Sequence, residues 1–317
     1  MKFLKSLFKL LNATDLSVVC FFLFLSFLNL IFYERITGWY LLIIINSGVI
    51  SLVFYLAKQH NSKPGKGWMY AHYFYLVPLI LFTFKELYLM VKPIRNIDYD
   101  QTLIAIDRFI FGADPTVVLY KFAHPVLTEL LQIVYATFYF LPVILGINLV
   151  LKKKWIELEY MAFCVVYGFF LSYIGYFLVP AVGPRFTLHD FAATDSELPG
   201  LFITNLLREV TNLGESIPNG TLNPAELVQR DVFPSGHTQM TLIVMYVAYK
   251  LNVKSRYFII PDGLLLIFST LYLRYHYFID LVGGLVFMII TMWTGNYIFN
   301  FWQRFKGLNE YKLSKLQ

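Results

Sequence analysis

Three short segments carry the residues best suited to chemistry, and each lies where an apolar run meets a polar stretch. They span 183–185, 233–238 and 274–280, and together they supply one arginine, two histidines and one aspartate. One histidine can attack phosphorus, a second can protonate the leaving oxygen, and an arginine can bind phosphate oxygens. The set indicates phosphoryl transfer without a metal or another cofactor.

His276 and Asp280 are four residues apart and therefore share one face of a helix. An aspartate so placed can accept a hydrogen bond from imidazole Nδ1–H and leave Nε2 free as a nucleophile. The alternative is a capping aspartate beside a solvated histidine. Two histidines and one aspartate could also ligate a divalent metal, but an arginine nearby would repel a cation and a third strong ligand is not evident. We therefore expect no metal.

The segment 233–238 opens an apolar run and reads Phe-Pro-Ser-Gly-His-Thr. Pro234 fits a helix start, and the unpaired N–H groups of a helix N-terminus suit a phosphate. Ser235 adds a hydroxyl donor, and Gly236 lets a ligand approach the backbone closely. His237 lies one step inside, where it could protonate a leaving oxygen. The alternative is a serine cap beside an interfacial histidine.

Two arginines are candidate phosphate ligands. Arg185 ends the first segment, and its planar guanidinium suits bidentate phosphate binding; the alternative is an arginine that snorkels to the membrane interface. Arg274 is either a second phosphate ligand or a plain interfacial cation. Lys85 and Glu86 lie inside an apolar run and point apart, so we expect each to form a structural ion pair with another helix. The remaining histidines have no evident partner in the sequence: His60, His72, His124 and His189.

The composition is that of a polytopic membrane protein. Of the 317 residues, 58% are hydrophobic and 15% are charged, whereas soluble domains carry about 25% charged residues. The mean hydropathy is +0.59. The net charge of +6 reflects membrane topology and contact with lipid surfaces, so we expect no nucleic-acid partner.

Eight apolar runs approach the length of about 20 residues that a membrane-spanning helix needs. They lie at 16–33, 38–57, 69–91, 129–151, 160–180, 236–251, 257–273 and 277–299. Lysine and arginine gather in alternate connections and at both termini, which predicts that those parts are cytoplasmic. All three candidate segments then lie on the outer face, periplasmic or lumenal. On that face we expect short interfacial helices within 92–128 and a long functional loop at 181–233 with one helix near 201–211.

This pattern predicts an all-α fold, a polytopic membrane bundle of about eight helices. We divide the chain into three parts. Residues 1–66 hold a basic interfacial stretch and two membrane helices, residues 67–300 form a six-helix catalytic core, and residues 301–317 form a basic cytoplasmic tail.

The motifs resemble those of the type 2 phosphatidic acid phosphatase superfamily of membrane lipid phosphatases and phosphotransferases. Residues 234–237 match its Pro-Ser-Gly-His motif in full, and His276 and Asp280 match the end of its third motif, with Ser269 at the serine position. The resemblance implies a six-helix core, with His276 as the nucleophile that forms a phosphohistidine and Asp280 as the residue that orients it. His237 becomes the general acid. Phosphate would be held by three residues: Arg185, Ser235 and Gly236.

The chain departs from the family pattern at its cationic positions. Leu178 replaces the lysine of the first motif, the dipeptide Pro184-Arg185 is reversed, and Thr270 replaces an arginine of the third motif, for which Arg274 could compensate. Residues 269–284 are most similar to the inositol phosphorylceramide synthase branch, which transfers a phosphorylated head group between lipids.

The resemblance thus favours a lipid head-group phosphotransferase. The alternatives are a lipid phosphate or polyprenyl diphosphate phosphatase and, in another class, a non-catalytic lipid-binding or transport protein. The expected substrates are phospholipid, sphingolipid or polyprenyl (di)phosphate, met within the membrane.

Overall fold

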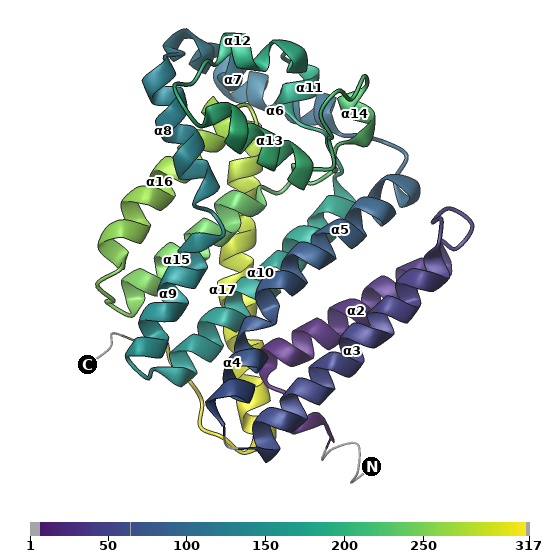
Figure 1. Cartoon of the computed structure of the whole chain (residues 1–317), viewed down its shortest axis with the longest axis vertical. Coiled ribbons are helices and arrows are strands. Elements are labelled where there is room, and N and C mark those ends of the chain that lie inside the picture. The colour runs from purple at the N-terminus through teal and green to yellow at the C-terminus, as the bar shows by residue number, and fades with distance from the viewer. Residues whose placement is uncertain (1–6, 64, 315–317) are drawn as a thin grey trace.

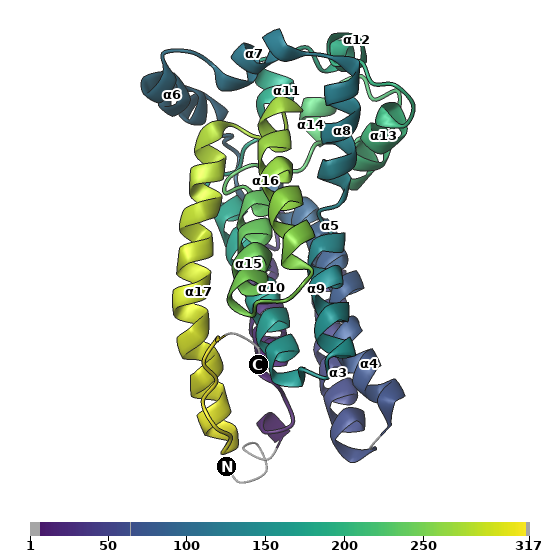
Figure 2. The same ribbon diagram turned by 90° about the vertical axis from the view of Figure 1, so that its left-hand side faces the viewer.

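The computed structural model describes residues 7–63 and 65–314, and within them the chain forms helices and no β-strand. Long helices run side by side as a bundle, and short helices cover one end of it (Figures 1 and 2). The predicted all-α membrane bundle is confirmed. Residues 1–6, which hold much of the predicted basic N-terminal stretch, lie outside the described part.

The bundle consists of α2 (Ala13–Ile31), α3 (Trp39–Ser62), α4 (Lys66–Phe74), α5 (Leu76–Ile94), α8 (Pro125–Ala136), α9 (Phe140–Leu151), α10 (Trp155–Leu178), α15 (Gly236–Lys250), α16 (Arg256–Tyr272) and α17 (Phe278–Lys306). The short helices at the covered end are α6 (Asp100–Phe111), α7 (Pro115–Leu119), η1 (Tyr120–Phe122), α11 (Pro184–Thr187), η2 (Phe191–Ala193), α12 (Thr194–Glu197), α13 (Thr204–Gly214) and α14 (Pro224–Leu227). We call this second group the cap. It contains the helix expected near 201–211, now α13.

Fewer helices meet the length of a full membrane span than the eight apolar runs predicted. In the described residues, five are long and apolar enough: α2, α3, α4 with α5, α10 and α17. The pair α8 and α9 makes a sixth if it is counted as one bent span. The other two runs do form helices, but α15 and α16 have 15 and 17 residues, fewer than the roughly 20 that cross a bilayer.

The apolar run 129–151 forms two helices rather than one, because two residues disrupt its helical backbone hydrogen bonds. Helices α8 and α9 meet at an angle of 51° around residues 137–139. The Thr137 hydroxyl donates to the carbonyl of Val134 at 2.6 Å and so competes with the helical hydrogen bonds. Pro142 lacks the N–H that would bind the carbonyl four residues earlier. The break turns the start of α9 toward the catalytic segments.

Helix α10 is the centre of the bundle and packs against α2, α5, α9, α15 and α17. It is apolar around its whole circumference, as expected of a helix buried on all sides. Gly175 lets the loop before α15 approach closely, since a Cβ there would lie 2.3 Å from the Pro234 ring. The core therefore holds the Pro-Ser-Gly-His segment directly against α10.

A polar network ties the N-terminal helices to the bundle at the end opposite the cap. Asp15 on α2 accepts from the His72 ring at 2.9 Å and from the Tyr75 hydroxyl at 3.0 Å. The ring of His60 on α3 lies 2.8 Å from that of His72. Neither contact was evident in the sequence: Asp15 is 57 residues from His72, and His60 meets His72 from another helix. Helix α17 also runs on to Lys306, so the predicted tail begins as helix.

Candidate active site

The three candidate segments meet beneath the cap. The rings of His237 and His276 lie 5.8 Å apart between centroids at an angle of 61°. The backbone N–H of Ser235 donates to the carbonyl of Asp280 at 3.0 Å. This bond joins the start of α15 to the start of α17, so the two histidines are held by a backbone contact between their own motifs.

Asp280 faces His276 as the spacing predicted. One carboxylate oxygen lies 3.4 Å from His276 Nδ1 and also accepts from the Tyr277 N–H at 2.7 Å. Asp280 is fully buried and His276 is 4% exposed. The 3.4 Å contact is longer than an ordinary hydrogen bond, and such catalytic contacts are often long before substrate binds and tighten with it. Asp280 therefore caps α17 and lies beside His276 Nδ1 at the same time.

Glycine shapes the phosphate loop between Pro234 and His237. Ser235 is the N-cap of α15, and its hydroxyl accepts from the Thr238 N–H at 3.2 Å. A Cβ on Gly236 would lie 2.6 Å from the Tyr176 hydroxyl, and one on Gly284 would lie 2.7 Å from the Ser235 carbonyl. The loop is thus wedged between α10 and α17, with its helix N-terminus beside the histidines.

A column of stacked side chains links Arg185 to His237. The Arg185 guanidinium lies 4.5 Å from the centre of the Tyr275 ring, and Tyr275 stacks on Tyr135 at 4.4 Å. Tyr135 stacks in turn on His237 at 4.7 Å. Phe138 lies against His237 at 4.2 Å. These rings hold His237 in position and connect it to Arg185 through Tyr135 and Tyr275.

Arg185 is buried, and two acidic side chains lie near its guanidinium group. It forms an ion pair with Glu215 and donates to the Asn212 side chain at 2.9 Å. Asp231, half-buried, lies close enough to interact electrostatically with both charges. Burial and then the negative charge of Glu215 raise the pKa of the Asp231 carboxyl. The positive charge of Arg185 is thus balanced in large part by the Glu215 carboxylate.

Arg274, the second candidate phosphate ligand, extends into the cap. It forms an ion pair with Glu197, and its guanidinium lies 5.1 Å from the centre of the Tyr120 ring. Its backbone has a φ of 67°, a left-handed conformation that is uncommon for arginine. Two of its buried nitrogens, Nε and Nη2, have no hydrogen-bond partner among the described residues. The structure therefore does not bring Arg274 and Arg185 together on one group.

Two acids on α6 hold the candidate segments in place, and the sequence analysis missed both. Asp100 accepts from the Gly183 N–H at 2.8 Å and from the Tyr277 hydroxyl at 2.7 Å. Asp107 accepts from the first two N–H groups of α17 at 2.7 and 2.9 Å. The buried residues of α6 follow the helical spacing i, i+3, i+4, i+7, which could have revealed this inward face: Asp100, Leu103, Ile104 and Asp107.

Helix α13 is held at both ends by charges from the bundle. Glu129 on α8 accepts from four backbone N–H groups of residues 201–204, at 2.8 to 3.3 Å. Lys85 on α5 donates to the carbonyls of Leu213 and Gly214, at 3.3 and 2.5 Å. Each charge complements the helix dipole at its end. Since α13 carries Asn212 and is followed by Glu215, this clamp fixes the partners of Arg185.

The expected ion pairs of Lys85 and Glu86 are replaced by polar contacts. Lys85 binds carbonyls and a serine hydroxyl at the end of α13, and Glu86 accepts from the Asn46 side chain at 2.8 Å. The two residues do point to different helices, as predicted.

His124 and His189 also have partners: His124 accepts from the Val126 N–H at 3.3 Å, and His189 lies 3.0 Å from the Thr116 hydroxyl.

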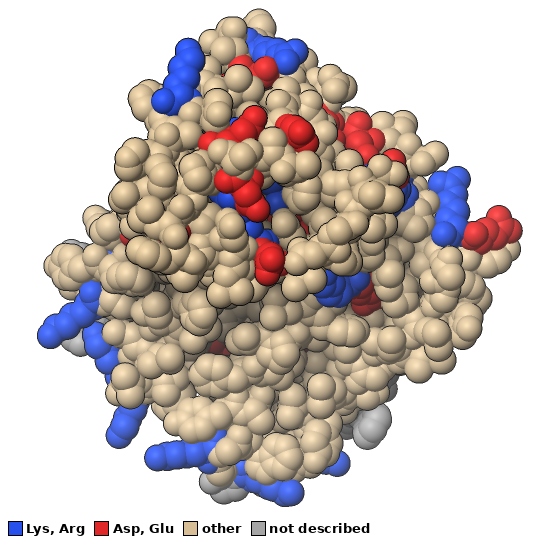
Figure 3. Space-filling view, turned by 45° about the horizontal axis from the view of Figure 1, so that its top comes forward, with Lys and Arg blue, Asp and Glu red and all other residues tan. Residues whose placement is uncertain are grey.

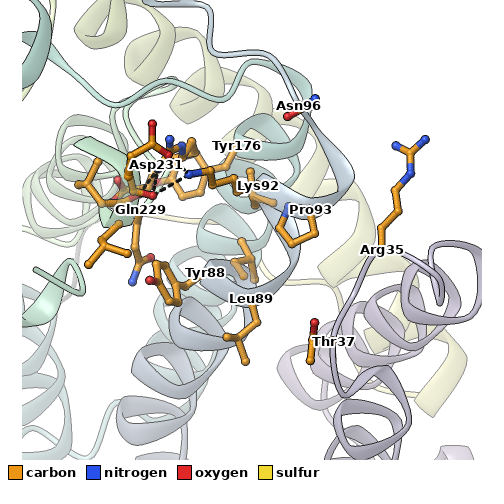
Figure 4. Close-up of a pocket in the computed structure, with 16 residues that line it drawn as sticks. Arg35, Thr37, Tyr88, Leu89, Lys92, Pro93, Asn96, Tyr176, Gln229 and Asp231 are labelled. Atoms are coloured by element: carbon orange, nitrogen blue, oxygen red, sulfur yellow. Dashed lines mark hydrogen bonds and ion pairs between the residues drawn. The ribbon is translucent and has the colours of Figure 1, made fainter. Parts of the chain in front are cut away.

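Two polar clefts open near the site. One, of about 280 Å³, lies within the cap and is lined by Arg185, Arg208 and Tyr275. The other, of about 610 Å³, lies between α5 and residues 226–231, with Tyr176 and Asp231 among its lining residues (Figure 4). In Figure 3 acidic side chains gather over the cap, and lysines and arginines line the lower rim of the view. The cap is thus the acidic end of the molecule, as the charge bias of the sequence predicted.

Among residues 7–63 and 65–314, no group of three or more His, Cys, Asp or Glu side chains is placed to hold a metal ion. The rings of His237 and His276 lie 5.8 Å apart, and Asp280 lies 3.4 Å from His276 Nδ1.

Comparison with known protein families shows which family the chain belongs to. The model described as PAP2 superfamily matches residues 101–294, more than half of the chain. The chain belongs to the PAP2 superfamily. Members of the PAP2 superfamily are phosphatases and phosphotransferases, so this protein is an enzyme of that general type, with lipid phosphates as its substrates and the membrane as its location. No curated protein and no solved structure gives a significant match.

The matched region contains all three candidate segments and the cap, and it begins after α5. The four N-terminal helices of the described part lie outside it: α2, α3, α4 and α5. Three candidate membrane spans therefore precede the matched region: α2, α3 and α4 with α5. The Asp15 network joins them to one another.

Proposed function

We propose that the protein transfers a phosphorylated head group from one lipid to the hydroxyl of another, through a phosphohistidine at His276, like the inositol phosphorylceramide synthase branch. One observation carries the choice of transfer over hydrolysis: Arg185, the candidate phosphate ligand at the histidines, is paired with Glu215 and lies near Asp231. A phosphomonoester carries two negative charges and needs several cations to bind it, whereas a phosphodiester carries a single negative charge. Acids around the arginine favour the diester, which is the chemical form of a lipid head-group donor.

The proposed reaction has two steps. His276 Nε2 attacks phosphorus, the bond from phosphorus to the diacylglycerol oxygen breaks, and His237 gives that oxygen its proton. Then the acceptor hydroxyl attacks phosphorus, His237 takes the hydroxyl proton, and the bond from nitrogen to phosphorus breaks. Asp280 holds His276 in the reactive tautomer through both steps. The N-terminus of α15 and Arg185 bind the phosphate oxygens.

The cap supports transfer by restricting water. The clamp on α13 holds this helix over the site, and α6 braces the candidate segments through Asp100 and Asp107. A covalent intermediate survives until a lipid hydroxyl arrives only if water has poor access. We place the cap on the outer face of the membrane and both termini in the cytoplasm, because the end opposite the cap carries the lysine-rich connections.

The test is a product analysis with purified enzyme. Radiolabelled phospholipid donors and prenyl diphosphates are supplied with and without hydroxyl-bearing lipid acceptors. The proposal predicts a labelled acceptor product from a diester donor, and only slow release of inorganic phosphate from phosphatidic acid. Rapid phosphate release that no acceptor alters would overturn the transferase and establish the lipid phosphate phosphatase instead.

A further inference from the structure

An apolar groove runs along the flank of the bundle toward the histidines. It lies between α5, α9 and α10, with a volume of about 120 Å³, and its lining is almost free of polar groups. Figure 2 shows α9 beside α5 along this flank. Six of its lining residues mark its course: Val77, Tyr139, Pro142, Gly146, Met161 and Phe169.

A second, smaller cavity, which we call the neck, lies beside the groove on the side of His237. The neck has a volume of about 20 Å³ and shares Tyr139, Pro142 and Phe169 with the groove. It also touches Thr241, one helical turn after His237 on α15, and Phe138. Phe138 is the ring that lies 4.2 Å from His237. The groove and the neck therefore lead from the flank to the Phe138 ring, which contacts His237.

The break between α8 and α9 creates this path. If α8 and α9 were one straight helix, residues 137–139 would not turn across the top of the groove. Gly146 removes a side chain where α9 crosses α10, facing Met161 and Leu158. Tyr73 stacks on Trp155 and closes the far end at a ring distance of 6.4 Å. The groove is thus bounded by residues 137–139 on the side of His237 and by Tyr73 at the end opposite the cap.

The length of the groove fits one membrane lipid chain. From Leu158 to Phe169 the groove follows α10 for about 16 Å, at 1.5 Å per residue. One leaflet contributes about 15 Å, half of the roughly 30 Å hydrocarbon core. Two lining residues, Phe74 and Val77, are 39% and 47% exposed, so the groove is open sideways to the bilayer.

We propose that this groove holds one hydrocarbon chain of the lipid substrate and thereby aligns its phosphate with the two histidines. The inference rests on the proposed lipid substrate and adds where its chain lies. The surrounding bilayer is as apolar as the groove, so burial there adds little affinity. The groove acts by fixing direction: the chain points away from the cap while the phosphate lies at the start of α15. The head group would then occupy the polar cleft within the cap that Arg185 lines.

Gly146 allows a test within one helix. A Cβ at this position meets Met161 and Leu158 at 3.4 and 3.6 Å, which is ordinary contact, so α9 can carry a side chain here without a backbone clash. Gly146→Phe places a ring inside the groove. Its matched control is Ile147→Phe, which adds the same ring to the next residue of α9, 47% exposed on the outward face.

Turnover is measured with a long-chain dioleoyl donor and with its short-chain dihexanoyl analogue. Gly146→Phe should lower kcat/KM for the dioleoyl donor about tenfold to hundredfold, because small misplacements of the reacting group have effects of this size. It should leave the dihexanoyl donor within about threefold, since a short chain does not reach the ring. Equal losses with both donors, or no loss with the dioleoyl donor, would overturn the proposal.

A photolabel separates this proposal from the reaction itself. A phospholipid with a diazirine at its chain end is irradiated with wild type, Gly146→Phe and Ile147→Phe. The label should map to 158–162 in wild type and in Ile147→Phe, and disappear in Gly146→Phe. This readout needs no turnover, so it decides the groove even if the transferase assay fails. Labelling of 158–162 that persists in Gly146→Phe would contradict the proposal.

Discussion

Asp280→Asn separates the two roles that one buried carboxylate plays. In the structure the same oxygen lies 3.4 Å from His276 Nδ1 and accepts from the Tyr277 N–H. An asparagine oxygen in the same place can still accept from Tyr277, but it carries no charge, so it holds the Nδ1–H tautomer of His276 more weakly than the carboxylate does. Loss of tautomer control lowers kcat by about 10² to 10⁴, or roughly 3 to 5 kcal/mol of transition-state stabilisation.

Stability provides the internal control. Because the cap of α17 persists in Asp280→Asn, its melting temperature in detergent should stay near that of wild type. Asp280→Ala loses the cap as well, which typically costs about 1 kcal/mol, so it should melt lower while its kcat falls by a similar factor. The assay is single-turnover head-group transfer with purified protein. A kcat for Asp280→Asn within about threefold of wild type would refute the orienting role.

Three further outcomes follow from the structure. Glu129→Ala should release the start of α13, seen as faster hydrogen exchange across 201–208 and lower activity; unchanged exchange would contradict the clamp. Burial lowers the pKa of His276, and only its neutral form attacks, so kcat/KM should hold as the pH falls past 6.5 and decline only at lower pH; a decline centred above pH 6.5 would argue against His276. Finally, Asn223→Cys should react with an impermeant thiol reagent in intact cells and Lys152→Cys only after permeabilisation; the reverse would invert the orientation.

The motifs could be read from the sequence because each is local. Ser235, Gly236 and His237 are consecutive, and His276 and Asp280 are one helical turn apart, so backbone geometry alone brings each group together. Where each segment meets an apolar run also predicted its place at a helix start. The structure adds that Ser235 and Asp280 are joined by a backbone hydrogen bond.

The partners of Arg185 and the two ends of α13 could not be read in this way. Glu215, Glu129 and Lys85 meet their partners across separations of 30 to 129 residues, and hydrophobic periodicity carries no information on which distant polar groups will pair. The inward acids of α6 are different, since their spacing is visible in the sequence. An apolar run of sufficient length can still break, as at Thr137, or form a helix of 15 residues, as α15 does. Hydropathy alone does not place such breaks.

The central claim is that His276 carries the phosphoryl group, and trapping that adduct tests it most directly. A donor labelled with radioactive phosphorus in its head group is mixed with enzyme, quenched within one turnover at alkaline pH and digested. We predict a base-stable, acid-labile label on the peptide that contains His276, absent from His276→Ala and formed slowly in Asp280→Asn. A label on the His237 peptide, or full turnover by His276→Ala, would contradict the account.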